Sequence, residues 1–269
     1  MKIYLLTLLS SLFFFSCGGL EDVQVFLATE DIQQGTNRFS IALADKNGLV
    51  NKDTIEVFFE GEEGYPKFSK ILTFTEFPDY YDSGLKRGIY SEIIEFNKAG
   101  NWTLKIGDSE IIFVVKKLSN SLNIGDIAPK SENLTLDDAS LENLSTGTDP
   151  FEPFYINKIS DLINDRSFFV VSFLSPAFCT SPTCGPQMET LKEIHKEIGT
   201  RNKIVHIETY INPKEVKENF ENKIINPVIQ EWGLDENQWL YVISDNGIII
   251  AKFEGFASAD NIKKYLPIY

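Results

Sequence analysis

An apolar run at 168–174, followed closely by two cysteines, constrains the fold of this chain more than any other segment. Only Ser172 interrupts the run, Cys179 and Cys184 come after it, and a helical hydrophobic pattern follows them. Such a run is typical of a strand in the middle of a sheet that is covered on both faces. The sequence therefore predicts a strand, a cysteine-bearing turn and a helix in succession.

Cys179 and Cys184 are close enough in sequence to form a disulfide or to hold a soft metal ion. Residues five apart on one helix are too distant to bond, so we place Cys179 in the turn and Cys184 at or inside the first helical turn. The unpaired N–H groups of a helix start favour a thiolate and lower a thiol pKa. In this arrangement Cys179 is the exposed attacking thiol, and Cys184 is the shielded thiol that resolves a mixed disulfide.

Length and charge limit the classes of protein to which the chain can belong. A chain of 269 residues is long enough for two domains, each with its own core. The net charge of −14 argues against nucleic acid as a partner, because nucleic acid requires a basic face. The same charge argues against electrostatic binding to anionic lipids.

The N-terminal segment 1–17 has the pattern of a secretory signal. It contains one lysine and a long apolar run, and Ser16 precedes Cys17. The sequence Phe14-Phe15-Ser16-Cys17-Gly18-Gly19 resembles a bacterial lipobox, with Phe14 where leucine is usual. The resemblance implies cleavage before Cys17, lipidation of its sulfur and a lipid anchor that holds an exported protein to the periplasmic side of a bacterial membrane. A simple signal peptide, or an uncleaved anchor, is the alternative.

After a tether at 18–22, residues 23–117 alternate apolar and polar side chains in short segments that turn residues separate. This spacing predicts an antiparallel β-sandwich domain. The stretch from Gly88-Ile89-Tyr90 to Ala99-Gly100-Asn101-Trp102 resembles small exported immunoglobulin-like modules, in particular the YtkA-like kind. This half contains no histidine or cysteine, so we expect it to act as a spacer or to bind a partner. The expected strands are Val23–Thr29, Phe39–Ala44, Thr54–Glu60, Ile71–Phe77, Ile89–Phe96, Trp102–Ile106 and Ile111–Lys117.

A polar junction at 118–122 is expected to link this domain to a second one over 123–269, in which strand and helix patterns alternate. A cut at the junction should release two independently folded pieces. The expected strands are Phe168–Leu174, Lys203–Tyr210, Trp239–Ser244 and Ile248–Phe253. The expected helices lie at Ile156–Ile163, from Met188 to Ile198, within Pro213–Trp232 with a break near Asn226-Pro227, and from Ser258 to Tyr265.

Two motifs in this second half resemble thioredoxin-like domains. The segment 123–129, with Gly125-Asp126-Ile127-Ala128-Pro129, is similar to the entry turn of domains of the TlpA and peroxiredoxin kind. Pro176-Ala177-Phe178-Cys179 and Cys184-Gly185-Pro186 are similar to exported thioredoxin-like proteins with a P-A-F-C-x4-C-G-P motif. The resemblance covers over half of the chain. It implies an α/β thioredoxin-like fold over 123–269, with Cys179 and Cys184 as a redox-active pair that forms a disulfide.

Three features depart from the thioredoxin pattern. The cysteines are separated by four residues, where thioredoxins have two. Asn237-Gln238-Trp239 stands where the fold usually has a cis-proline, and Ser172 stands where thioredoxin carries a buried acid. The last two changes remove groups that assist thiol exchange.

Peroxidase chemistry is disfavoured by the spacing of the motif. Pro176 and Thr180 have the spacing found in peroxiredoxins, but Cys184 falls one position late. The nearest arginines in the sequence, Arg166 and Arg201, have no reason to reach the thiolate.

Copper handling by a Sco-like protein is another alternative, since two close thiolates suit Cu(I) when a histidine completes the site. His195 lies at the edge of a helical apolar stripe and His206 lies inside an apolar strand. At such positions packed, hydrogen-bonded histidines are more common than ligands, and neither residue lies in the loop before Trp239, where a ligand is expected. A purely structural disulfide, pinning a loop to a helix in a binding module, is the third reading.

The sequence as a whole predicts an exported, membrane-anchored thioredoxin-like protein that exchanges thiols and disulfides with partner proteins through Cys179 and Cys184. No resident cofactor is expected, and copper is the alternative ligand.

Overall fold

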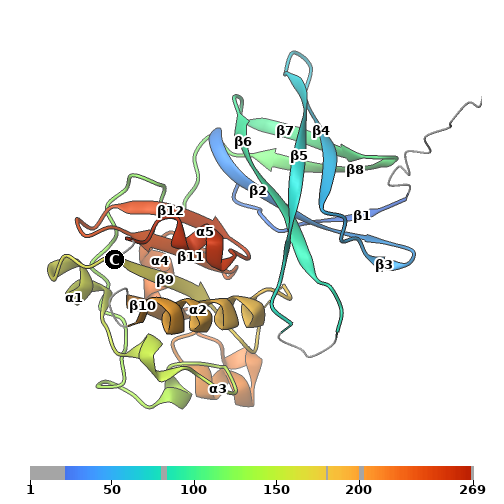
Figure 1. Ribbon diagram of the computed structural model, residues 1–269. Coiled ribbons are helices and arrows are strands. Elements are labelled where there is room, and N and C mark those ends of the chain that lie inside the picture. The colour runs from blue at the N-terminus through green and yellow to red at the C-terminus, as the bar shows by residue number, and fades with distance from the viewer. Residues whose placement is uncertain (1–21, 80–83, 180, 200–202, 268–269) are drawn as a thin grey trace, which may run out of the picture.

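The computed structural model describes residues 22–79, 84–179, 181–199 and 203–267. The predicted signal segment and Cys17 lie outside the described residues, as do Thr180 and Arg201. The described chain is mostly β-structure, with a strand-only part up to residue 117, the β region, and a later part that combines a smaller sheet with helices, the mixed-sheet region (Figure 1).

The β region consists of one eight-stranded sheet in the order β1-β2-β6-β5-β4-β7-β8, with β3 paired to β2. Residues 67–73 of β5 pair with β4, and residues 73–76 pair with β6, so β5 joins two layers of strands. The strands are β1 (Gln24–Leu27), β2 (Gly35–Asp45), β3 (Gly48–Leu49), β4 (Thr54–Gly61), β5 (Lys67–Glu76), β6 (Gly88–Phe96), β7 (Gly100–Ile106) and β8 (Ser109–Val115).

The two ends of this sheet nearly meet. Gln34 N donates to Lys116 O at 2.8 Å, and Lys116 N donates to Ile32 O at 2.8 Å, which links the segment after β1 to the end of β8. The expected sandwich has two separate sheets, whereas the observed strands form one continuous, nearly closed sheet. Alternation identifies the inward side chains of each strand but carries no information on where a strand passes from one layer to the other.

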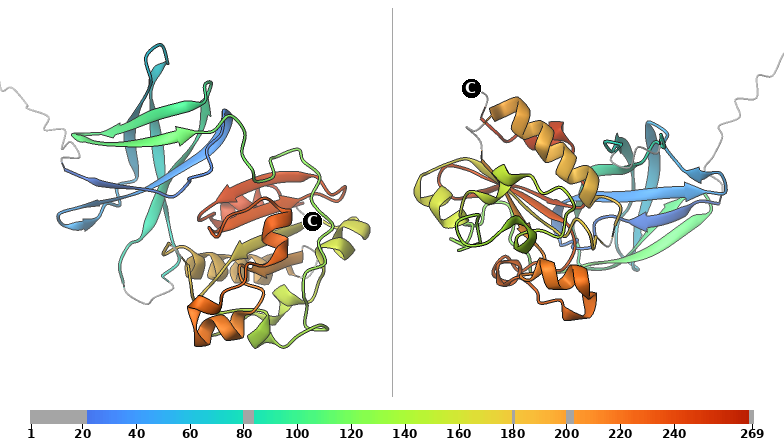
Figure 2. Two further views of the ribbon diagram at one scale, coloured as in Figure 1. Left: turned by 180° about the vertical axis from the view of Figure 1, so that it is seen from behind. Right: turned by 90° about the horizontal axis from the view of Figure 1, so that it is seen from below.

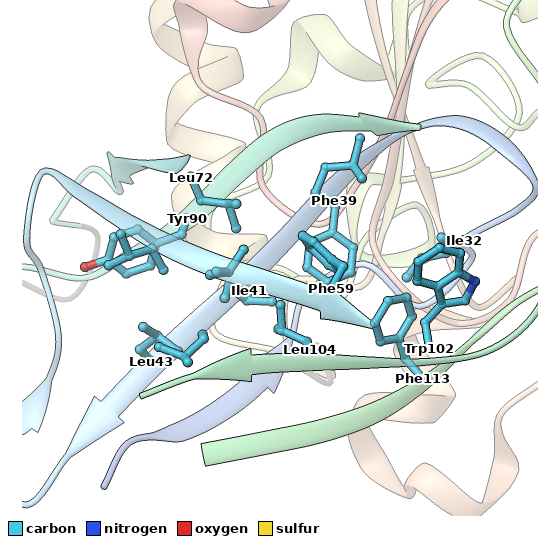
Figure 3. Packing of buried hydrophobic residues seen from close by; sticks show 14 of the residues in the cluster. Ile32, Phe39, Ile41, Leu43, Phe59, Leu72, Tyr90, Trp102, Leu104 and Phe113 are labelled. Carbon is cyan, nitrogen blue, oxygen red and sulfur yellow. The ribbon is translucent and has the colours of Figure 1, made fainter. Parts of the chain in front are cut away.

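The core of the β region is rich in interlocked aromatic rings (Figure 3). In β4 the side chains of Ile55, Val57 and Phe59 are buried while those between them point outward, as the alternating pattern predicts. Phe59 meets Phe39 edge to face, with ring centroids 5.2 Å apart. Trp102 is fully buried in the same cluster, so burial of aromatic surface is the main stabilising contribution here.

The mixed-sheet region contains a four-stranded sheet in the order β10-β9-β11-β12. Strand β10 runs parallel to β9, whereas β11 is antiparallel to both β9 and β12. The strands are β9 (Phe169–Leu174), β10 (Lys203–Glu208), β11 (Trp239–Ile243) and β12 (Ile249–Glu254). The helices are α1 (Ile159–Asn164), α2 (Cys184–Ile198), α3 (Pro213–Glu218), α4 (Pro227–Glu231) and α5 (Ala259–Lys263), with short 3-10 turns η1 (Leu141–Asn143), η2 (Glu152–Tyr155) and η4 (Phe220–Asn222).

Helices cover both faces of this sheet, so all six residues of β9 are buried, as the apolar run predicts. Val170 and Leu174 share a core with α2 and α5. Phe169, Val171 and Phe173 point to the other face and share a core with α1 and α4. Figure 2 shows α2 on one side of the sheet, with the β region beside it. The predicted break near Asn226-Pro227 is also present, because Asn226 caps α4 and Pro227 begins it.

The junction at 118–122 is packed rather than loose. Ser119 and Ser121 are buried, and the hydroxyl groups of both donate to the carboxylate of Asp31. Gly233 has a φ of +65°, and a Cβ there would lie 2.0 Å from Asn120 O, so a glycine is required where the junction passes α4. These contacts hold the junction against Asp31 and the end of α4, and the independent folding of the two parts stays a prediction.

Candidate functional site

Cys179 and Cys184 form a disulfide with a Cα–Cα distance of 6.0 Å, which is within the usual range. Cys179 lies in the turn that follows β9, and Cys184 is the first residue of α2, as the sequence predicts. Cys184 is 2% exposed and packs in the core beneath α2, whereas Cys179 is half-buried. The sulfur of Cys179 is therefore the more accessible of the two.

Three polar side chains fix the start of α2. Thr183 Oγ1 donates to Gln238 Oε1 at 2.8 Å, and Gln238 Nε2 donates to Gly255 O at 3.0 Å. Gln187 Oε1 accepts from Gln238 Nε2 at 3.2 Å and from Ala257 N at 2.8 Å. All three side chains are buried, and together they tie the disulfide turn to the ends of β11 and β12. Gln187 gave no signal in the sequence, and Gln238 was visible only as part of a departure from the thioredoxin pattern, because the pairing of the two side chains depends on the fold.

Gln238 and Ser172 are the residues at the last two departures from the thioredoxin pattern named above. Gln238 lies directly before β11 and takes part in the network just described, and the described residues contain no cis peptide bond. Ser172 is buried in the middle of β9, and its hydroxyl has no hydrogen-bond partner among the described residues. Neither Ser172 nor Gln238 has a side chain that titrates near neutral pH.

An aromatic cluster that includes Phe178 flanks Cys179. The ring of Phe178 stacks on Phe220 of η4 with centroids 5.0 Å apart, and it meets Tyr210 edge to face at 6.3 Å. Lys223 Nζ lies 5.0 Å from the centroid of the Phe220 ring. Phe220 is 39% exposed, so this cluster presents an apolar surface immediately beside the disulfide.

A cavity of about 260 Å³ lies between the disulfide turn and the β region. Ser181, Pro182 and Thr183 line it from the disulfide turn, and Phe26 and Phe77 line it from the β region. Most of its lining is apolar, and its volume is enough for one or two side chains of a partner.

The two histidines are packed residues, as the sequence predicts. His206 Nδ1 accepts from Tyr155 Oη at 2.7 Å, and its Nε2 donates to Leu174 O at 3.0 Å. Burial lowers the pKa of His206 to about 4, so the ring is neutral. His195 packs against Phe151, with ring centroids 5.3 Å apart, and burial lowers its pKa as well.

The donor set does not fit a copper centre that requires a histidine. His206 is held by two protein hydrogen bonds and His195 lies among aromatic rings. Within the described residues no group of three or more histidine, cysteine or acidic side chains is placed to hold a metal ion. The two thiol sulfurs described, those of Cys179 and Cys184, are bonded to each other.

Arg166 lies before the start of β9, at the end of the sheet opposite the disulfide, in keeping with the argument against a peroxidase. Among the described helices, none has both the length and the apolar character needed to cross a membrane. No protein-family model, curated protein or solved structure matches the chain. Its function is therefore argued from the disulfide and its surroundings.

Proposed function

We propose that this chain is an exported thiol–disulfide exchange protein whose mixed-sheet region is thioredoxin-like and whose redox pair is Cys179–Cys184. The observation that carries the proposal is the unequal access to the two sulfurs. Cys179 is half-buried in a turn, while Cys184 is 2% exposed at the start of α2. A partner can reach one sulfur, and the other can act only within the chain.

The reaction follows from this asymmetry. In the reduced protein, the Cys179 thiolate attacks one sulfur of a partner disulfide, and the partner's other sulfur leaves as a thiolate. The Cys184 thiolate then attacks Cys179 Sγ, which reforms the intramolecular disulfide and releases the partner as a dithiol after proton uptake. Two electrons pass from the chain to the partner, and the reverse sequence oxidises a partner dithiol.

The order of the sheet supports the thioredoxin-like part of the proposal. The chain passes from β9 through the cysteine turn and α2 to the parallel strand β10, and then to the antiparallel hairpin β11–β12. The disulfide follows the carboxyl end of a central strand, which is where α/β sheets place their functional groups.

Polypeptide partners are favoured over small thiols by the surroundings of the disulfide. The cluster around Phe178 and Phe220 offers apolar surface beside Cys179, and Ser181, Pro182 and Thr183 of the same turn line the 260 Å³ cavity. Part of this cavity is lined by the β region, which supports a partner-binding role for that region. Export and a lipid anchor at Cys17 complete the proposal, and they rest on the sequence of the signal segment.

Trapping experiments with single cysteine variants test the exchange reaction. Cys184→Ser should accumulate mixed disulfides with partners through Cys179, because the resolving thiol is missing. Cys179→Ser, the matched control, should trap few partners because its remaining thiol is buried. A structural disulfide predicts no trapping by either variant, together with a lower melting temperature on reduction, since loss of a disulfide typically costs about 2–5 kcal/mol. A copper protein predicts that both variants lose Cu(I) binding alike.

The lipid anchor has its own test. Mass spectrometry of the membrane fraction should find a mature chain that begins at an acylated Cys17. A product that retains residues 1–16, or one that is free in solution, contradicts the anchor without affecting the exchange proposal.

A further inference from the structure

A buried carboxylate lies next to the strand end from which the disulfide turn begins. Glu208 is the last residue of β10, is 3% exposed, and pairs in register with Leu174, the last residue of β9. Its Oε2 accepts hydrogen bonds from Thr146 N at 2.7 Å and from Thr146 Oγ1 at 2.9 Å. The reaction described above makes no use of this group.

Thr146 connects the carboxylate to the turn that carries Cys179. Its Oγ1 accepts a hydrogen bond from Ala177 N at 3.2 Å and lies 3.1 Å from Ser175 Oγ. Ala177 is two residues before Cys179, so a continuous set of hydrogen bonds runs from Glu208 to the backbone of the turn. The strength of the bonds at one end affects the position of the groups at the other.

The charge of Glu208 changes in the neutral pH range. Burial raises the pKa of its carboxyl group to about 7, although the hydrogen bonds from Thr146 and Ser175 act in the opposite direction. A cavity of about 20 Å³, enough for a single water molecule, borders Glu208, His206 and Tyr155, which gives the carboxyl group a place to exchange its proton.

The other titratable groups around Glu208 keep a constant charge near neutral pH. Tyr155 on η2 and Tyr210 after β10 both have a raised pKa, and the pKa of His206 is lowered to about 4. Lys217 of α3 donates to Ser145 O at 3.3 Å. Among the described groups that border Glu208, its own carboxyl group is therefore the one whose charge changes near neutral pH. Glu254, whose pKa is also raised to about 7, lines the cavity beside Ser181 and Thr183 and is unchanged in every variant of the reduction test below.

We propose that Glu208 is a positioning residue for the disulfide, whose carboxylate acts through Thr146 to hold the 175–177 backbone and to keep Cys179 presented for attack. Protonation of the carboxylate weakens this hold, because hydrogen bonds to an ionised acceptor are stronger than those to a neutral one. The inference rests on the proposed exchange reaction, since it concerns the rate at which the Cys179–Cys184 disulfide is attacked.

The test compares disulfide reduction by dithiothreitol in the oxidised full chain and in Glu208→Gln from pH 5.5 to 8.5. Taking the ratio of the two rates at each pH cancels the titration of the reductant. The ratio of the wild-type rate to the variant rate should be close to one below pH 6. It should rise to about five above pH 8, with a midpoint near pH 7. Thr146→Val, which lacks the connecting hydroxyl, should resemble Glu208→Gln.

Glu197→Gln, a change at an exposed acid near the end of α2, is the matched control and should give a ratio near one at every pH. A ratio for Glu208→Gln that is independent of pH, or a faster variant, overturns the positioning role. Melting temperatures of both variants check that the fold is retained. Failure of the exchange proposal is distinguishable, because the ratio can still follow the expected curve while Cys184→Ser traps no partner.

Discussion

Asp31 of the β region and Lys252 of β12 approach each other within 3.5 Å, from Oδ2 to Nζ, and both side chains are largely buried. Lys116 Nζ lies 2.7 Å from the other carboxylate oxygen of Asp31. Burial alone raises the pKa of Asp31, but the hydrogen bonds from Lys116, Ser119 and Ser121 outweigh it and hold the pKa at about 2. One ionised carboxylate thus joins β1, β8, the junction and β12.

Replacing Asp31 with Asn should destabilise the whole described chain. Loss of the carboxylate leaves Lys252 buried without its counter-ion, and breaking a buried pair in this way typically costs about 3–5 kcal/mol. We expect a decrease of about 3 kcal/mol in the free energy of unfolding, measured by urea denaturation at pH 7. The wild type should also lose stability as the pH falls from 4 towards 2, because the folded-state pKa of Asp31 lies below its unfolded value.

Glu60→Gln is the control for this prediction. Glu60 also binds two lysines, Lys67 and Lys105, but at the surface of the β region, where solvent screens the charges. Its removal should leave the urea midpoint nearly unchanged. Equal effects of the two substitutions would show that the Asp31 cluster does not stabilise the contact between the parts.

Glu254 should make stability fall as the pH rises through neutrality. Burial raises the pKa of its carboxyl group to about 7, although the backbone N–H groups of Asp31 and Glu30 bond to it. A raised folded-state pKa contributes stability that is full below pH 4.5 and is lost as the pH rises through 7. The free energy of unfolding of the wild type should therefore fall by at most about 3 kcal/mol between pH 5 and pH 8, and Glu254→Gln should abolish this fall.

The measurement is the free energy of unfolding by urea at four pH values, with Glu193→Gln on the exposed face of α2 as the control. The difference between wild type and Glu254→Gln should grow in favour of the variant as the pH rises. A difference that stays constant with pH would mean that Glu254 does not titrate in this range.

The hydrogen-bonded Gln238 should contribute to the stability of the disulfide turn. Gln238→Leu keeps the volume but leaves Gly255 O without this partner in a buried site, which costs about 1–3 kcal/mol for an unpaired group, and it leaves Thr183 Oγ1 with Ser181 Oγ as its partner. We expect the melting temperature to fall and proteolysis near the turn to become faster. Gln230→Leu, a matched change at an exposed position of α4, should alter neither.

The hydrophobic pattern of the sequence predicts the individual strands and helices well, because the spacing of apolar residues and the length of each apolar run determine which side chains are buried. Residues 169–174 of the apolar run form a fully buried strand, and Cys184 begins the helix after it. The pattern does not reveal that β5 joins two layers, since that depends on pairing between distant strands. The short polar segment 118–122 has the composition of a linker, yet its serines bond to Asp31, some 90 positions away. The cysteines of the site are visible in the sequence, whereas Glu208 and Gln238 act through contacts that exist only in the folded chain.

Phe178 should matter for the exchange reaction only when the partner is a protein. Its ring stacks on Phe220 beside Cys179, and the cluster is partly exposed to an approaching surface. Truncating an aromatic anchor at the centre of an interface typically costs more than 1 kcal/mol, so Phe178→Ser should lower kcat/KM for a protein disulfide about tenfold. A small disulfide such as oxidised glutathione does not extend over the cluster, so its rate should change little. The control is Phe58→Ser, at a half-exposed phenylalanine on the outer face of β4, which should affect neither substrate. An equal loss of rate for the protein and the small disulfide would place the effect of Phe178 on Cys179 itself rather than on partner binding.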